Sequence, residues 1–267
     1  MDFKRVGAIV LRQFYLIRSS TTRVLPLFIW VAVDIVLWGF LTRYLNAVSD
    51  ADFNFVPALL GAVLLWDFFI RIMQGVTMAF FEDVWSRNFI NIFSTPVSIY
   101  EYVTGLVASS IATSTVGIVV MFFLAIVVFG LSFFSYGIVI IPILLILFMF
   151  GIALGIAASA LVLRMGPAAE WFIWPIPAII SPFAGVLYPI SILPQWMQVV
   201  SKILPPSYVF ESLRAVVEGS PVSWMSLLVS SVLAVIYILL ACLFFTGTYK
   251  HAVRTGLIAR YSAESLS

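Results

Sequence analysis

Residues 138–163 read IVIIPILLILFMFGIALGIAASALVL and contain no charged side chain. An α-helix rises about 1.5 Å per residue, so a helix over this stretch is roughly 39 Å long. The hydrocarbon layer of a membrane is about 30 Å thick. The stretch therefore predicts a helix that crosses a membrane.

The composition of the whole chain supports a membrane protein. Of its 267 residues, 63% are hydrophobic and 10% are charged, whereas soluble domains carry about 25% charged residues. The single Cys242 excludes an intramolecular disulfide, and with the single His251 it is too little for an ordinary zinc site. We expect neither a metal nor a cofactor in this chain. A net charge of +2 gives no indication of a nucleic-acid partner.

The apolar runs predict an all-α integral membrane protein with six transmembrane helices. The first run begins at Val24 without the cleavage pattern of a signal peptide, so we expect it to stay in the protein. The fifth run contains Pro175, Pro177 and Pro182. The predicted spans cover 24–41, 55–78, 99–129, 138–163, 168–187 and 224–246.

Residues 2–19 predict an amphipathic helix that precedes the first span. Basic residues lie opposite an apolar face, which is typical of a helix in the cytosolic headgroup layer. The alternative is a cytosolic helix that packs on a partner. The apolar face comprises Phe3, Val6, Val10, Phe14 and Ile17, and the basic face Lys4, Arg5 and Arg12.

The distribution of basic residues predicts the orientation. With six crossings both termini lie on one side, and ten Lys and Arg residues fall in segments on that side against three on the other. Cytosolic segments of membrane proteins are enriched in Lys and Arg. We therefore expect a plasma-membrane protein with both termini in the cytosol.

The connection 81–93, FEDVWSRNFINIF, predicts a short amphipathic helix on the cytosolic side. Such a helix with two aromatic residues suits a groove of another protein. The alternative is packing on its own bundle or in the lipid interface. Thr95-Pro96 ends the helix, because a residue before proline avoids the helical region. The candidate docking residues are Phe81, Val84, Trp85, Asn88, Phe89 and Ile92.

Charged residues interrupt three predicted spans. Asp67, Arg71 and Gln74 recur at i, i+4 and i+7, which places them in one stripe of the second span. A charge at the centre of a span costs about 3 kcal/mol, so Asp67 and Arg71 are expected to pair. The stripe either fixes the packing or lines a substrate path. Asp34 and Glu170 have no local partner, and Arg71 and Arg164 are the candidates.

Small residues recur every four positions in the fourth span. Gly151, Gly155 and Ser159 allow a close approach of helix backbones. This stripe predicts packing within one bundle or, alternatively, a dimer face.

Residues 188–219, YPISILPQWMQVVSKILPPSYVFESLRAVVEG, are apolar but contain four prolines. They cannot form one straight span, and they predict two short helices near 195–203 and 207–217. Irregular backbone at membrane depth needs protein or water around it, which favours a re-entrant helical hairpin that gates the outer mouth. The alternative is an interfacial hairpin. The candidate gate residues are Tyr188, Pro189, Leu193, Pro194, Trp196, Pro205 and Pro206.

Motifs of catalysis are missing from these 267 residues. No G-x-x-x-x-G-K-[ST] loop occurs, because Lys4, Lys202 and Lys250 follow Phe, Ser and Tyr. Neither G-x-S-x-G nor H-E-x-x-H is present. We therefore expect that the chain is not an enzyme.

Two elements together carry a family resemblance: FSTPVSIYEYVTG with Thr95, Pro96 and Glu101, and the later YP, LP, PP and ESLR elements. Nearly the whole chain resembles membrane subunits of ABC exporters of the type-two permease class. The resemblance implies a homodimer with two separate ATPase subunits that bind ATP and Mg²⁺. It implies that 2–19 is an elbow helix, 81–93 the coupling helix and 188–219 a re-entrant gate.

The resemblance also implies the substrate class, an amphipathic, lipid-linked or hydrophobic molecule such as a drug, glycolipid or polysaccharide precursor. A secondary transporter or channel that uses the Asp67/Arg71 stripe is the alternative function. A lipid-modifying enzyme is disfavoured by the missing catalytic residues.

Overall fold

The computed structural model describes residues 1–19, 21–48, 56–86, 88, 91, 92, 94–131 and 133–256, and within these ranges all regular structure is helical. The α-helices are α1 (Phe3–Arg18), α2 (Thr21–Val48), α3 (Gly61–Trp85), α5 (Ile99–Phe129), α6 (Ile140–Met165), α7 (Glu170–Ile173), α8 (Ile176–Ala184), α9 (Gln195–Ser201), α10 (Pro205–Val217) and α11 (Trp224–Thr255). A π-helix, Val56–Leu60, precedes α3, and 3-10 helices cover Phe133–Val139, Gly166–Ala169 and Ile190–Ile192.

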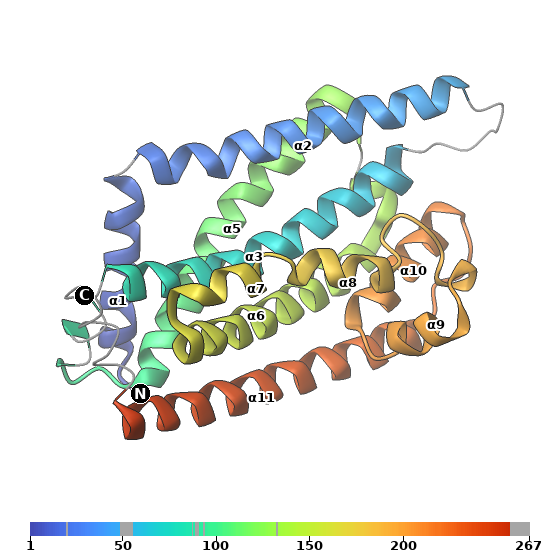
Figure 1. Ribbon diagram of the computed structural model, residues 1–267. Helices are drawn as coiled ribbons and strands as arrows, with labels where there is room; N and C mark the ends of the chain where they lie inside the picture. The colour runs from blue at the N-terminus through green and yellow to red at the C-terminus, as the bar shows by residue number, and fades with distance from the viewer. Residues whose placement is uncertain are drawn as a thin grey trace.

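The long helices form a bundle with two distinct ends (Figure 1). Helix α6 packs between α3 and α11, and α5 packs on α3, α2 and α1. Helix α1 runs across one end, where the N-terminus and the last turns of α11 lie. Helices α9 and α10 lie at the opposite end. We call these the terminal end and the distal end.

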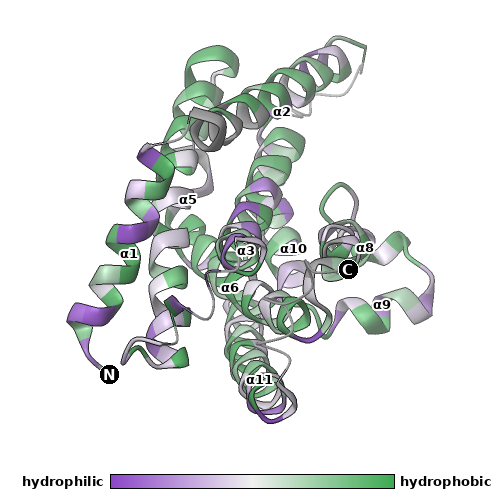
Figure 2. Cartoon of the chain, turned by 60° about the vertical axis from the view of Figure 1, so that its left-hand side comes forward, coloured by the Kyte–Doolittle hydropathy of each residue, from purple (hydrophilic) through white to green (hydrophobic). Residues whose placement is uncertain are grey.

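Four helical segments of the described chain are long and apolar enough to cross a membrane: Val56–Trp85, Ile99–Phe129, Tyr136–Met165 and Trp224–Thr255. Helix α2 is 28 residues long. The outward side chains of α5 and α11 are also apolar, for example Val119, Phe123, Leu239 and Leu243. Figure 2 colours α6 and α11 mostly as hydrophobic, whereas α1 alternates between hydrophilic and hydrophobic turns. Apolar side chains on the outer surface of the bundle are what a lipid environment requires, because hydrocarbon cannot form hydrogen bonds with polar groups.

The predicted fifth span, 168–187, is not one helix. It is divided into Gly166–Ala169, α7 and α8. Pro175 lacks the N–H that would continue α7, and the residue before a proline avoids helical geometry. The apolar helical piece Trp171–Ala184 is shorter than a full crossing. The total of six crossings stays a prediction.

The structure also differs from the predicted helix 81–93. Helix α3 continues to Trp85, so Phe81 and Val84 belong to its last turns and are buried in the chain's own bundle. The apolar spacing that predicted a separate helix simply continues the inward face of α3. Phe89 lies outside the described residues.

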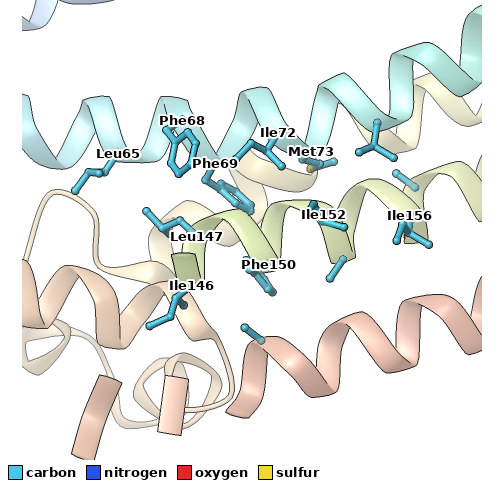
Figure 3. Packing of buried hydrophobic residues seen from close by; sticks show 14 of the residues in the cluster. Leu65, Phe68, Phe69, Ile72, Met73, Ile146, Leu147, Phe150, Ile152 and Ile156 are labelled. Atoms are coloured by element: carbon cyan, nitrogen blue, oxygen red, sulfur yellow. The ribbon is translucent and has the colours of Figure 1, made fainter. Parts of the chain in front are cut away.

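The core is the interface between α3 and α6. Figure 3 shows Phe69, Ile72 and Met73 of α3 facing Phe150 and Ile152 of α6. The rings of Phe69 and Phe150 stack with centroids 5.4 Å apart. A methyl group at Gly155 would lie 2.8 Å from Cβ of Val76 and 2.9 Å from the carbonyl oxygen of Met73. The small-residue stripe Gly151, Gly155 and Ser159 therefore packs α6 within one chain, with the Ser159 hydroxyl donating to the Gly155 carbonyl.

Gly155→Val should destabilise the bundle, because the added carbons overlap the backbone of α3. Overpacking of this kind costs about 1–3 kcal/mol. Thermal unfolding of the detergent-solubilised protein measures the effect. Gly247→Val is the matched control, because no heavy atom lies within 4 Å of a Cβ built at that helical glycine. Equal melting temperatures for the two variants would contradict the assignment of this interface.

Candidate functional site

A buried carboxylate joins three helices at the terminal end. Asp83, near the end of α3, is 1% exposed. Arg12 of α1 binds it through both terminal nitrogens, with Nη1 at 2.9 Å from Oδ2. Tyr102 of α5 donates its hydroxyl to the same oxygen at 2.6 Å. The hydrogen bond to Asp83 raises the pKa of the Arg12 guanidinium, which favours the charged pair.

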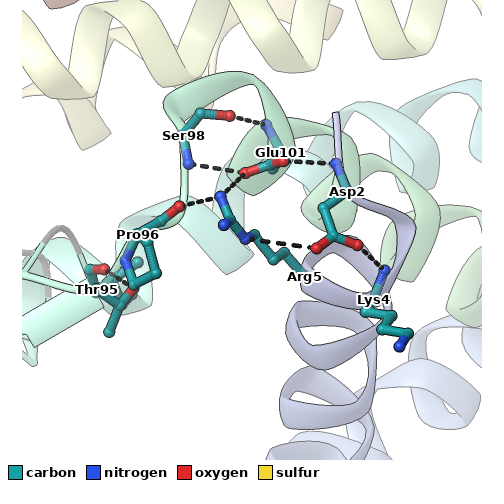
Figure 4. A network of polar contacts seen from close by, with 8 residues as sticks. Asp2, Lys4, Arg5, Thr95, Pro96, Ser98 and Glu101 are labelled. Atoms are coloured by element: carbon teal, nitrogen blue, oxygen red, sulfur yellow. Dashed lines mark hydrogen bonds and ion pairs between the residues drawn. The ribbon is translucent and has the colours of Figure 1, made fainter.

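A second carboxylate lies at the start of α5 (Figure 4). Glu101 accepts the backbone N–H of Ser98 at 2.9 Å, and the Ser98 hydroxyl accepts the N–H of Glu101, which completes a capping box. Glu101 also accepts the N–H of Asp2 at 2.7 Å. Arg5 lies 3.6 Å from the same carboxylate and donates to the carbonyl of Pro96.

These contacts show what the family-like residues of the first element do. The hydroxyl of Thr95 donates to the carbonyl of Ile92, three residues earlier, and closes the turn. Pro96 offers its carbonyl to Arg5, and Glu101 caps α5. The connection of residues 86–98, which we call the α3–α5 connection, is therefore held at both of its ends.

The predicted docking residues divide into two groups. Phe81 and Val84 are buried, and Ile92 packs partly against the core. Trp85 is 49% exposed although its ring contacts that of Phe81, and Asn88 is half-buried. Of the described residues in the predicted set, Trp85 is therefore the exposed one, and Asn88 and Ile92 are half-buried.

Sequence reasoning placed α1 incorrectly in one respect. Arg12 was expected on the face toward the headgroups, but it binds the buried Asp83. The buried residues of α1 are Val6, Ile9 and Gln13, and Phe3 and Phe14 of the predicted apolar face are exposed on the surface of the chain. Tyr102 was missed as well, because nothing in the local sequence marks it as a partner of Asp83.

Tyr102→Phe should lower the stability of the terminal end. The change removes one hydrogen bond to a charged, buried acceptor, which is worth about 2 kcal/mol. The melting temperature in detergent checks this. Tyr100→Phe, two residues away on the exposed side of the same helix, should leave it unchanged. If Tyr102→Phe melts like the unmodified protein, the hydroxyl does not stabilise the buried pair.

The charged residues of the first two predicted spans lie where α3 faces α2 and α5. Arg71 donates from Nε to Asp67 at 2.7 Å, and both side chains are largely buried. Asp34 of α2 is close enough to interact electrostatically with both. Gly117 of α5 lies beside the Arg71 chain. Arg71, one of the two predicted partners of Asp34, is therefore near it, while the side chain of Glu170 lies outside the described part of the structure.

Gln74 lines a groove between α3 and the segment that comprises Trp174 and α8. The groove has a volume of about 440 Å³. Its walls are mostly apolar, with the amide of Gln74 and the hydroxyl of Ser181 as polar groups. The predicted stripe is thus split between an ion pair that faces α2 and α5 and an amide that faces the groove. The lining residues are Trp66, Ile70, Gln74, Trp174, Pro177, Ala178, Ser181 and Pro182.

The distal segment contains a second polar cluster. Glu211 of α10 accepts the backbone N–H of Ile190 at 2.8 Å and binds Arg214 at 2.9 Å. Arg214 also donates to the carbonyl of Gly185, directly after α8, at 2.7 Å. Gly185 has a φ of 65°, a conformation that favours glycine. The ESLR element therefore fastens α10 to the chain that leaves α8.

The candidate gate residues lie in the same distal segment, in the chain from α8 to the start of α10. Pro205 and Pro206 form the first turn of α10, where a missing N–H has no cost, and both are buried. Pro194 is the N-cap residue directly before α9, and Trp196 is exposed. Tyr188 donates its hydroxyl to the Pro182 carbonyl, whereas Pro189 is exposed and Leu193 is half-buried. Two short helices are present, and their depth in a membrane stays a prediction.

Glu211→Ala should loosen the distal segment. It leaves the Ile190 N–H and part of Arg214 without an acceptor, at a cost of about 1 kcal/mol because the carboxylate is partly exposed. Hydrogen exchange should become faster in peptides that cover residues 185–193 and stay unchanged in α11. Glu218→Ala, at the exposed end of the same helix, is the control. Unchanged exchange at 185–193 would refute the fastening role.

Among the described residues, no three His, Cys, Asp or Glu side chains lie close enough together to hold a metal ion.

Comparison with known proteins gives the family. The family model of the ABC-2 type transporter matches residues 5–217. No curated protein matches the chain. The matched range contains Arg12, Asp83, Glu101, Glu211 and the groove, whereas Asp2 lies before it. ABC-2 domains are membrane components that work with an ATPase and are not themselves catalytic. The chain therefore belongs to the ABC-2 type transporter family and is a multi-pass membrane permease.

Proposed function

We propose that this permease is the membrane subunit of an ATP-driven exporter. Two copies of the chain would form the path, and two copies of a separate ATPase, which binds ATP and Mg²⁺, would dock at the terminal end. The observation that carries this proposal is the α3–α5 connection, which is held at both ends by ion pairs while Trp85 stays exposed beside it.

The surface around the connection suits a protein partner. Trp85 and Tyr100, on either side of it, are 49% and 59% exposed. Ser94, Thr95 and Pro96 between them are exposed as well. Large aromatic side chains on a rigid support are the usual anchors of protein interfaces. Because Trp85 belongs to α3 and Tyr100 to α5, a partner that binds these two side chains acts on the helices directly.

The cytosolic orientation is supported by α1. Phe3, Leu11, Phe14 and Tyr15 are exposed on its outer side, and Lys4 and Arg18 are exposed as well. Apolar side chains beside cations suit the layer between acyl chains and anionic headgroups. Together with the excess of basic residues on the side of the termini, this favours a cytosolic terminal end in the plasma membrane.

The groove between α3 and α8 is the candidate wall of the path. Two tryptophans offer a wide apolar surface, and Gln74 and Ser181 offer hydrogen bonds. A groove of this kind suits an amphipathic or hydrophobic molecule, including a lipid-linked one. A second copy of the chain would cover its open side. The proline-bounded helices α9 and α10 would close the path at the distal end.

The alternative is an ion-coupled carrier. It is favoured by one observation, that Asp34 adds a second carboxylate to the single guanidinium of Arg71. The two functions differ in their energy source. Transport in proteoliposomes that persists without the ATPase and nucleotide would favour the carrier, and transport that requires both would favour the exporter.

Trp85→Ala should weaken the association of the ATPase with the permease. Loss of a central aromatic anchor costs about 2 kcal/mol, or roughly thirtyfold in affinity. Co-purification of the ATPase and its hydrolysis rate in the complex measure the change. Trp224→Ala removes an exposed tryptophan at the distal end and should leave both unchanged. Full association of the Trp85→Ala variant would argue against docking at the connection.

A further inference from the structure

Helix α1 contacts both ends of the α3–α5 connection. Near its start, Asp2 and Arg5 bind Glu101 and the carbonyl of Pro96. Two turns further along, Arg12 binds Asp83, three residues before the connection begins. The ten residues from Asp2 to Arg12 span roughly 15 Å of helix. The two ends of the connection are thus tied to one short rigid element.

The tie at Asp83 cannot open cheaply. Asp83 is 1% exposed, and Arg12 supplies the guanidinium that compensates its charge. Withdrawal of α1 would leave a buried carboxylate without its cation, which is strongly destabilising.

The packing behind the ion pairs is also close. A methyl group at Gly105 of α5 would lie 2.7 Å from Cβ of Ile9, so the backbone of α5 approaches α1 directly. Ile9 itself is buried. Helix α1 is therefore held on α5 by side-chain packing as well as by the charges.

We propose that α1 is a strap that makes the two ends of the connection move as one unit, and that Asp83 is the positioning residue of this strap. The proposal rests on the proposed function, in which the ATPase pushes on the connection. The displacement of the connection is then transmitted to α1 through Arg12 and Asp83. As a result α1, with its exposed apolar side in the membrane interface, moves along the membrane surface. In a chain without the strap, the connection would move and α1 would stay.

Pulsed EPR distances on the full permease–ATPase complex test the strap. Spin labels at Ser94→Cys in the connection and at Tyr15→Cys in α1 are each measured against Met225→Cys at the distal end, in a Cys242→Ser background. All three label sites are exposed. We expect that trapping the ATPase with ATP and vanadate shifts both distances. In the double variant Arg12→Met/Asp83→Leu the Ser94 shift should remain, and the Tyr15 shift should fall to less than half.

The double variant replaces the ion pair by apolar side chains, which usually preserves stability. Arg18→Met, an exposed arginine on the same helix, is the control and should keep both shifts. Should the double variant fail to fold, Glu101→Gln keeps the side-chain size and weakens the contacts of Asp2 and Arg5, with the same expected loss of the Tyr15 shift.

Three outcomes would overturn the strap. If Ser94 shifts and Tyr15 does not in the unmodified chain, α1 is not coupled, although the proposed docking stands. If Tyr15 follows Ser94 fully in both the double variant and Glu101→Gln, the coupling does not run through these contacts. If neither label shifts on trapping, the proposed docking at the connection fails and the strap fails with it.

Discussion

The constraint on which the terminal end depends is the buried charge of Asp83. A carboxylate with 1% exposure must be compensated, and its partners come from two other helices, Arg12 on α1 and Tyr102 on α5. Three elements that are distant in sequence must therefore meet at one point. Because α1 also reaches Glu101, the position of the N-terminal helix follows from where α3 ends and α5 begins.

At the distal end, too, polar side chains of one helix satisfy groups of a segment that is distant in sequence. Glu211 and Arg214 satisfy backbone groups of the chain that leaves α8, where prolines and Gly185 prevent a continuous helix. Between the two polar clusters lies an apolar core of α3 and α6 (Figure 3). This arrangement suits a bundle in lipid. Hydrocarbon forms no hydrogen bonds, so the middle of the bundle is held by apolar packing and the two polar clusters lie at its ends.

Local patterns predicted the helices well where the physical cause is local. The long uncharged run of α6 was evident, and the spacing of Ser98 and Glu101 is a second local signal, a capping box, which was missed. The burial of Asp83 could not be predicted, because Arg12 lies 71 positions away. The end of α3 was misplaced for a related reason: the apolar spacing of residues 81–92 fits either a separate helix or the continuation of α3, and only the tertiary contacts decide.

Helix α3 carries the buried Asp83, the Asp67–Arg71 pair and one wall of the groove. It is therefore the element that would transmit a movement of its end to the groove. The end of α3 carries Asp83, and its middle carries the Asp67–Arg71 pair toward α2 and α5. A neighbouring stripe of the same helix, Trp66, Ile70 and Gln74, forms one wall of the groove. A helix of 25 residues is stiff over roughly 37 Å. A displacement at Asp83 therefore cannot stay local. In the proposed mechanism it would shift the groove wall formed by α3 relative to α8, which begins directly after Pro175.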